Sequence, residues 1–225
     1  MVLGRGFVIQ GIEETGGCFQ AGNSSSCAKT LHSEGIVFVT TWGCRSHMVN
    51  IVTMPDGQKY MLDVGFGNDG PTRPLPLSHG VVSQGILPQE LRLVRENLAQ
   101  NTDPDQMLWI YQRRYSPKDE WTSVYCFTEL EFLPQDYEVM NFWTSQSRRS
   151  WFTYGIIVVK MIMENETLIG TLILDGEVVK RRIRGSTEKW ICKTEDERIE
   201  ALKTWFNIEL TQDERAGIRG LVTEL

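Results

Sequence analysis

The sequence of 225 residues lacks the features that mark several large classes of protein. It holds only three histidines and five cysteines, and no two cysteines show the C-x-x-C spacing of a zinc site. Because the number of cysteines is odd, a disulfide framework is not expected either. Reduced thiols of this kind are typical of a cytoplasmic protein. We therefore predict a cytoplasmic protein without a bound metal.

Long apolar runs and an excess of positive charge are absent as well. No stretch approaches the roughly 20 apolar residues of a membrane span, so no membrane partner is expected. The formal net charge of −6 argues against nucleic acid as the main partner, because such binding depends on neutralising phosphates. The first residues, MVLGRGFVIQGIEETGG, combine a short apolar patch with two glutamates and are a poor secretion signal. Nothing in the sequence indicates the oligomeric state.

The apolar pattern predicts strands over most of the chain and helices near its ends. Strands are expected at 35–41, 47–53, 60–64, 91–94, 108–115 and 125–131, with an antiparallel meander at 156–163, 167–174 and 177–183. Helices are expected at 23–32 and from 134 onward, whereas residues 1–17 carry little pattern. Thr194 with Glu197, and Thr211 with Glu214, predict two capping boxes near the C-terminus. This order of elements predicts an α+β fold.

The stretch YMLDVGFGNDGPTRPLPL contains Gly65-x-Gly67-x-x-Gly70 directly after a predicted strand. That pattern marks a dinucleotide-binding turn only where a helix follows, since the pyrophosphate binds N–H groups at the start of the helix. Three of the six residues after Gly70 are prolines, which lack an N–H group and disfavour helical backbone before them. The dinucleotide interpretation is therefore rejected, and Asp63 becomes the candidate for chemistry.

His47 begins an apolar strand whose predicted hairpin partner ends at Asp63. The tight turn between the strands returns the chain on itself, so the two side chains can approach each other from adjacent strands. A carboxylate beside an imidazole fixes the tautomer of the ring and stabilises the imidazolium. The alternative is that His47 is a hydrogen-bonded residue at a strand end and Asp63 a turn residue.

Cys18 is the candidate nucleophile, because it follows two glycines and precedes the predicted helix at 23–32. A position near a helix N-terminus and a histidine favours the reactive thiolate. The alternative is a buried apolar cysteine, which is the commoner role of this residue. Cys27 and Cys44 are rivals, although three residues along a strand place Cys44 on the opposite face from His47.

The segments GGCFQ, SHMVNIV and DVGFGNDGPTRPLPL, together with FWTSQSRRSWF and RGLVTEL, resemble the arylamine N-acetyltransferases, especially the fungal branch. The resemblance implies a cysteine-proteinase-like fold with a central β-barrel and an α/β lid. It also implies a ping-pong reaction through a thioester on Cys18, with His47 as base and Asp63 as orienter. Acetyl-CoA or another acyl-CoA would be the cosubstrate, without a permanently bound cofactor, and an arylamine or arylhydrazine the acceptor.

The resemblance further implies a coenzyme site in a proline-stiffened turn whose glycines allow close backbone approach. Its residues would be Ser46, Gly67, Gly70 and Arg73. A net-acidic protein needs local positive charge to hold CoA. A second basic cluster on a predicted strand is a further source of charge, or else solvated charge on a strand edge; it consists of Lys180, Arg181, Arg182 and Arg184.

The sequence departs from the family around the nucleophile. The family motif reads Arg-Gly-Gly-aromatic-Cys-x-Glu/Gln-x-Asn, whereas Thr15 stands at the arginine position and Gly17 directly precedes Cys18. The N-terminal helical domain is accordingly expected to be largely missing, with a remnant at 1–34, a β-barrel domain at 35–133 and the lid with the tail at 134–225. Two other functions remain open: a catalytically impaired paralogue, and a papain-like or transglutaminase-like cysteine hydrolase.

Overall fold

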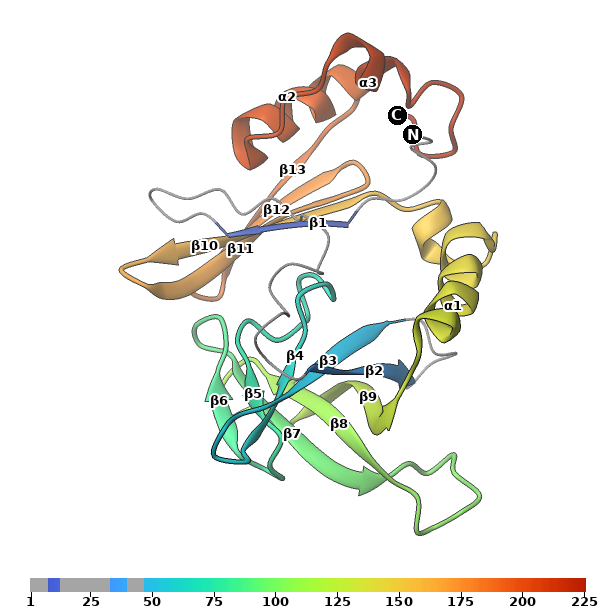
Figure 1. Cartoon of the computed structure of the whole chain (residues 1–225). Helices are drawn as coiled ribbons and strands as arrows, with labels where there is room; N and C mark the ends of the chain where they lie inside the picture. Colours follow the sequence, from blue (N-terminus) through green and yellow to red (C-terminus); the bar gives the residue numbers. More distant parts are fainter. Residues whose placement is uncertain (1–7, 13–32, 40–46) are drawn as a thin grey trace. The chain divides into compact units, whose positions relative to one another are not determined.

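The structure is a computed structural model that describes residues 8–12, 33–39 and 47–225, with side chains from residue 47 onward (Figure 1). The chain groups into two compact units. The first unit comprises residues 22–141, and the second comprises residues 1–21 together with 142–225. No helix in the described ranges is long and apolar enough to cross a membrane.

The first unit is built on an eight-stranded antiparallel sheet in the order β5-β4-β3-β2-β9-β8-β7-β6. Its strands are β2 (Ser33–Val39), β3 (Met48–Thr53), β4 (Lys59–Leu62), β5 (Leu75–Pro76), β6 (Val82–Gln84), β7 (Glu90–Asn97), β8 (Met107–Arg114) and β9 (Thr122–Glu131). The helix α1 (Pro134–Gln146) follows β9, and the boundary between the two units falls within it.

The main core of the first unit lies on one face of this sheet, because successive side chains of a strand point to opposite faces. A smaller buried cluster of Val94, Leu108, Ile110 and Cys126 covers part of the opposite face. Leu75 comes from β5 at one end of the sheet and Leu91 from β7 near the other end, yet both belong to the same buried cluster. The sheet therefore curls around its core. The remaining members are Val49, Ile51, Met61, Leu93, Trp109, Tyr111, Tyr125 and Phe127.

The second unit contains a five-stranded sheet in the order β1-β10-β11-β12-β13. Its strands are β1 (Val8–Ile12), β10 (Ile157–Glu164), β11 (Thr167–Asp175), β12 (Val178–Ile183) and β13 (Ser186–Ile191). β1 runs parallel to β10, and the others pair antiparallel. A single-turn 3₁₀ helix, η2 (Trp151–Thr153), precedes the sheet, and α2 (Glu195–Phe206) and α3 (Gln212–Ala216) follow it. Phe206 and Ala201 of α2 pack against Leu172, Leu174 and Val179 of the sheet.

The α+β class and the predicted meander of β10, β11 and β12 are confirmed, but four strands were missed. Two of them, β5 and β6, are only two and three residues long and lie in the stretch that follows Gly70. The strand β1 lies in the segment interpreted as patternless. It forms a strand by pairing parallel with β10, and no local pattern in the sequence reveals such a distant partner. β13, with the sequence STEKWI, is exposed along its whole length, so it has no apolar alternation to detect. The predicted helix at 23–32 lies outside the described residues.

The predicted helix caps are confirmed, with one difference of detail. Thr211 and Glu214 form a complete capping box at α3. Thr194 caps α2 by accepting the Glu197 N–H, but the Glu197 carboxylate accepts from the backbone N–H of Lys193 instead of Thr194. Thr194 thus pairs one free N–H group of the first helical turn, while the Glu197 carboxylate binds the residue just before the cap.

Candidate active site

The β3–β4 hairpin brings His47 and Asp63 together. Asn50 pairs with Leu62 across the two strands, so the continued register places His47 opposite Gly65, with Asp63 diagonal to it on the same face. The ring Nε2 of His47 lies 2.9 Å from Oδ1 of Asp63. The turn is closed by Met54 and Gln58, and Gly57 adopts a positive φ of 83° that favours glycine. The predicted proximity of the two side chains is confirmed.

Asp63 is surrounded by hydrogen-bond donors. Its side chain is 0% exposed, whereas that of His47 is 19% exposed. Besides the imidazole, Oδ1 accepts the backbone N–H of Gly65 at 3.1 Å, and Oδ2 accepts the hydroxyl of Tyr125 at 2.8 Å. A buried carboxylate is tolerated only where such partners replace water. The three donors therefore hold Asp63 in one orientation, with one oxygen directed at His47.

Aromatic rings fix the imidazole from the side. Phe66 meets the His47 ring edge to face, with centroids 5.1 Å apart, and lies 4.8 Å from the Tyr125 ring. Such pairs are favourable beyond the area they bury. Since Phe66 follows Asp63 by three residues, the loop that leaves β4 supplies both the carboxylate and the wall beside its partner ring.

Sequence reasoning missed Tyr125, which β9 places in the core. Burial, the negative charge of Asp63 and the hydrogen bond to Asp63 raise the pKa of Tyr125 well above its ordinary value. The phenol therefore stays neutral and remains a donor to the carboxylate. The sequence indicates only that a tyrosine in an apolar strand such as 125–131 requires a hydrogen-bond partner for its hydroxyl once it is buried. It does not identify Asp63, because 62 residues separate the two.

The loop after Asp63 is an irregular turn that no helix follows. This agrees with our rejection of a dinucleotide-binding turn. Gly67 has a φ of 87°, which favours glycine, and its carbonyl accepts the N–H of Gly70 at 3.1 Å. A Cβ atom on Gly70 would lie only 2.8 Å from Cβ of Phe66. Asp69 forms an ion pair with Arg113 at 2.9 Å, which fastens the loop to β8. The two glycines are thus required by the shape of this loop.

The other predicted site residues divide into two groups. Cys18 and Ser46, with the rivals Cys27 and Cys44, lie outside the described residues. Arg73 is exposed on the loop and has no ion-pair partner within residues 47–225. In the same part of the chain, no group of three or more His, Cys, Asp or Glu side chains is arranged to hold a metal ion.

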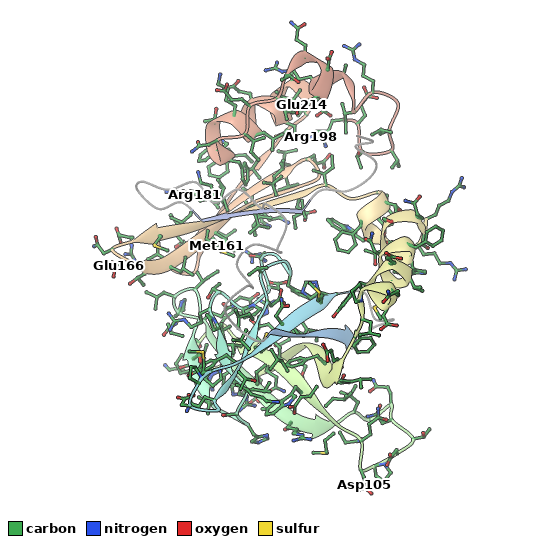
Figure 2. All side chains as sticks on the ribbon, in the orientation of Figure 1. Asp105, Met161, Glu166, Arg181, Arg198 and Glu214 are labelled. Carbon is green, nitrogen blue, oxygen red and sulfur yellow. The ribbon has the colours of Figure 1, made fainter. Side chains whose placement is uncertain are left out.

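The basic cluster on β12 belongs to the second unit, and most of its members are paired with acids. Lys180 contacts Asp175 at 3.0 Å, and Arg181, labelled in Figure 2, contacts Glu188 at 3.1 Å. Arg184 is paired with Glu164. Because these cations are already paired with acidic side chains, we interpret the basic cluster as solvated surface charge and not as a phosphate-binding site.

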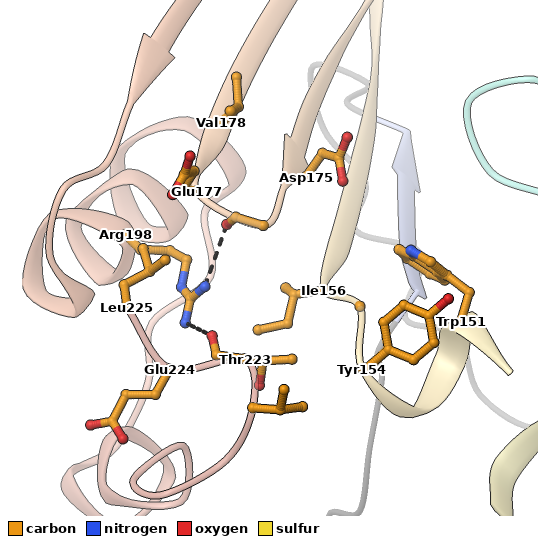
Figure 3. A pocket seen from close by; sticks show the side chains of 13 residues that line it. Trp151, Tyr154, Ile156, Asp175, Glu177, Val178, Arg198, Thr223, Glu224 and Leu225 are labelled. Carbon is orange, nitrogen blue, oxygen red and sulfur yellow. Dashed lines mark hydrogen bonds between the residues drawn. The ribbon is translucent and has the colours of Figure 1, made fainter. Parts of the chain in front are cut away.

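The second unit also contains a cavity of about 400 Å³ that holds none of the predicted site residues (Figure 3). Trp151 and Tyr154 form one side of it, and the last residues of the chain form another. Arg198 lies beside it, 2% exposed, and donates to the carbonyl oxygens of Gly176 at 3.4 Å and Thr223 at 2.8 Å. Glu195 is its acidic partner. Arg198 therefore joins α2, the β11–β12 turn and the tail.

Comparison with known proteins places the chain in a family. Residues 38–215 match the model of a family described as N-acetyltransferase. The N-malonyltransferase FDB2 of Fusarium pseudograminearum is 41% identical over 185 residues, which are 77% of this chain and 53% of the relative. The protein of the same name from Gibberella moniliformis is 42% identical over 181 residues, 76% of this chain and 52% of the relative. The chain thus spans about half the length of these curated relatives.

Solved structures agree on the fold. The Mycobacterium marinum arylamine N-acetyltransferase in complex with CoA has a TM-score of 0.70 at 24% identity, over 86% of this chain and 69% of that one. The Nocardia farcinica arylamine N-acetyltransferase has a TM-score of 0.64 at 26% identity, over 86% of this chain and 65% of that one. The predicted cysteine-proteinase-like fold is therefore confirmed. Because the family model covers most of the sequence, the chain belongs to the arylamine N-acetyltransferase family.

Proposed function

We propose that this chain acts in N-acyl transfer, moving a short acyl group from acyl-CoA to an arylamine or arylhydrazine through a thioester on Cys18. The observation that carries this proposal is the 2.9 Å contact between His47 Nε2 and the buried carboxylate of Asp63. A histidine oriented in this way is the base–orienter half of a nucleophilic triad. The CoA complex of the Mycobacterium marinum enzyme supports CoA as the donor.

In the first half-reaction, His47 takes the proton of the Cys18 thiol on Nδ1, because Nε2 is directed at Asp63. The thiolate attacks the acyl carbonyl carbon, and the bond from that carbon to the CoA sulfur breaks. The proton held by the imidazolium passes to the CoA thiolate. Asp63 stabilises the imidazolium while it exists, and Phe66 and Tyr125 prevent the ring and carboxylate from turning apart.

In the second half-reaction, the amine nitrogen attacks the carbonyl carbon of the thioester. The bond from that carbon to the Cys18 sulfur breaks, and the nitrogen loses a proton to His47, which passes it to the Cys18 thiolate. The products are the N-acylated amine and the original thiol–imidazole pair. The same base thus serves both halves, as a ping-pong reaction requires.

For the acyl group, we propose malonyl or acetyl. Two relatives that are about 41–42% identical are N-malonyltransferases, which favours malonyl-CoA. A malonyl group carries a free carboxylate that a cation must meet. Arg73 is a candidate for that carboxylate or for a CoA phosphate, because it follows the glycine loop and has no ion-pair partner within the described residues.

Intact-mass spectrometry tests the proposal. The protein is incubated with malonyl-CoA or acetyl-CoA without amine, and we expect a mass increase of one acyl group together with release of the CoA thiol. Peptide mapping should locate the acyl group on Cys18, and Cys18→Ser should abolish it. Cys27→Ser and Cys44→Ser are matched controls that should retain it.

Addition of an arylamine to the acylated protein should restore the original mass and produce the amide. Failure of both donors to acylate any cysteine would favour the catalytically impaired paralogue. Acylation followed by hydrolysis at the same rate with and without amine would favour a hydrolase instead.

A further inference from the structure

A second buried tyrosine lies beside Tyr125. Tyr111 on β8 is the direct cross-strand partner of Tyr125 on β9, and the two ring centroids are 4.9 Å apart. Tyr111 is 0% exposed, and its hydroxyl has no hydrogen-bond partner within the described part of the chain. A buried hydroxyl without a partner carries a desolvation cost. Such groups are rare in native proteins, and each calls for a physical explanation.

The hydroxyl of Tyr111 lies in the electric field of the candidate site. Burial raises the pKa of Tyr111, the positive charge of Arg113 opposes this, and the negative charges of Asp63 and Asp69 raise it further. Tyr111 in turn contributes to the raised pKa of Tyr125. The phenol therefore stays neutral and keeps its donor proton.

Asp63 has room for one more donor. A carboxylate offers about four lone-pair positions, and His47, Gly65 and Tyr125 occupy three of them. The strand pairing changes at this same place, since Tyr111 pairs with Tyr125 whereas Gln112 pairs with Ser123. The extra residue on β9 forms a β-bulge, a feature that re-aims side chains next to active sites.

We propose that Tyr111 is a positioning residue for the Asp63–His47 pair, with its hydroxyl as a reserve donor to the Asp63 carboxylate. This inference rests on the proposed acyl transfer. When the imidazolium gives up its proton, the buried carboxylate loses the opposite charge beside it. A further O–H donor stabilises the anion at that step and keeps Oδ1 aligned with Nε2 of His47.

Tyr111→Phe tests the inference because it removes only the hydroxyl and keeps the ring in the core. We expect an unchanged or higher Tm, since an unsatisfied polar group is lost, together with a fall in kcat of about tenfold and an unchanged KM for acyl-CoA. A role in packing alone would move stability and rate in the same direction. Tyr60→Phe is the matched control, because its exposed hydroxyl donates only to Gln58, and both quantities should stay constant.

Nuclear magnetic resonance of ¹⁵N-labelled histidine supplies a readout that needs no substrate. The chain holds only three histidines, so the ring nitrogens of His47 can be assigned with His32→Gln and His79→Gln. Tyr111→Phe should shift the His47 Nε2 resonance, and Tyr60→Phe should leave it in place. In addition, the effects of Tyr111→Phe and Tyr125→Phe on this resonance should not be additive, because both phenols act on one carboxylate.

The two proposals fail in different ways. A His47 resonance that does not move in Tyr111→Phe overturns the positioning role, whatever the rate does. If the unaltered protein transfers no acyl group but the resonance moves, the proposed function fails and the link from Tyr111 to Asp63 and His47 stands.

Discussion

The Tyr125 hydroxyl donates to Oδ2 of Asp63 at 2.8 Å, on the oxygen that His47 does not use. The carboxylate is therefore held from both sides, by the imidazole from the β3–β4 hairpin and by the phenol from β9. Removing either partner leaves a buried charge with fewer donors, which is costly for stability as well as for orientation.

Tyr125→Phe should weaken both the fold and the reaction. The lost hydrogen bond to a charged acceptor is worth about 1.5–3 kcal/mol, and we expect the free energy of unfolding to fall by that amount. If Asp63 orients His47, acyl transfer should slow by roughly 10- to 100-fold. Urea unfolding and steady-state kinetics measure the two effects, with Tyr60→Phe as control. A variant of normal stability and rate would show that the phenol does not support Asp63.

Asp63→Asn should reduce acyl transfer by about 10⁴, the loss seen when the orienting acid of a serine triad becomes an amide. The amide keeps the size of the side chain but cannot compensate the charge of the imidazolium. Asp56→Asn is the matched control: Asp56 lies in the turn of the same hairpin, where it accepts only the Gln58 N–H. Single-turnover acylation of Cys18 is the measurement. A rate within about threefold of the unaltered protein would remove Asp63 from the proposed mechanism.

Arg198→Met should destabilise the second unit by about 1–3 kcal/mol, because it removes the buried donor of the charge-assisted hydrogen bonds to Glu195. The carbonyl oxygens of Gly176 and Thr223 lose a donor at the same time. Lys203→Met on the same helix is the control, since Lys203 is exposed and pairs only with Glu209. Urea unfolding followed by tryptophan fluorescence compares the two variants, and equal midpoints would contradict the role assigned to Arg198.

Cys192 should react slowly with iodoacetamide at neutral pH. Burial and the nearby Glu197 raise the pKa of its thiol, and Arg198 opposes this only in part. Because the folded pKa lies above that of the unfolded chain, the contribution of Cys192 to stability is complete below the unfolded value. It is lost as the pH rises toward the folded value. Peptide mapping from pH 7 to pH 10, compared with the urea-unfolded chain, should show protection that is largest below about pH 8.5, the usual thiol pKa, and that diminishes as the pH rises above it.

What could be predicted from the sequence depended on how far apart the partners lie along the chain. His47 and Asp63 are 16 residues apart in one hairpin, and a tight turn between apolar strands specifies such a pair. Tyr125 is 62 residues from Asp63, and its position depends on the order of strands in the whole sheet. A single sequence does not contain that order in any local pattern.

The loop after Asp63 shows how a local rule can exclude one function without identifying another. Three prolines ruled out a helix behind the glycines, and the structure has none there. The ion pair between Asp69 and Arg113 was not foreseeable, because it joins the loop to a strand far along the chain. Its consequence is that β8 supports both Tyr111 in the core and the loop beside the candidate site.

The parallel pairing of Val8 with Ile157 has a consequence for the order in which the chain becomes structured during synthesis. The strand β1 leaves the ribosome long before β10 and cannot pair until β10 has been made. The last strand of the first unit's sheet ends at Glu131. This sheet can therefore form before the strands β10 to β13 of the second unit have been synthesised. Long-range pairing of this kind is slow, and until it occurs the edge of β10 remains open to other strands. A ribosome stalled where residue 141 has just left the exit tunnel should therefore carry a protease-resistant first unit, while the β1 segment of the same chain is still cleaved.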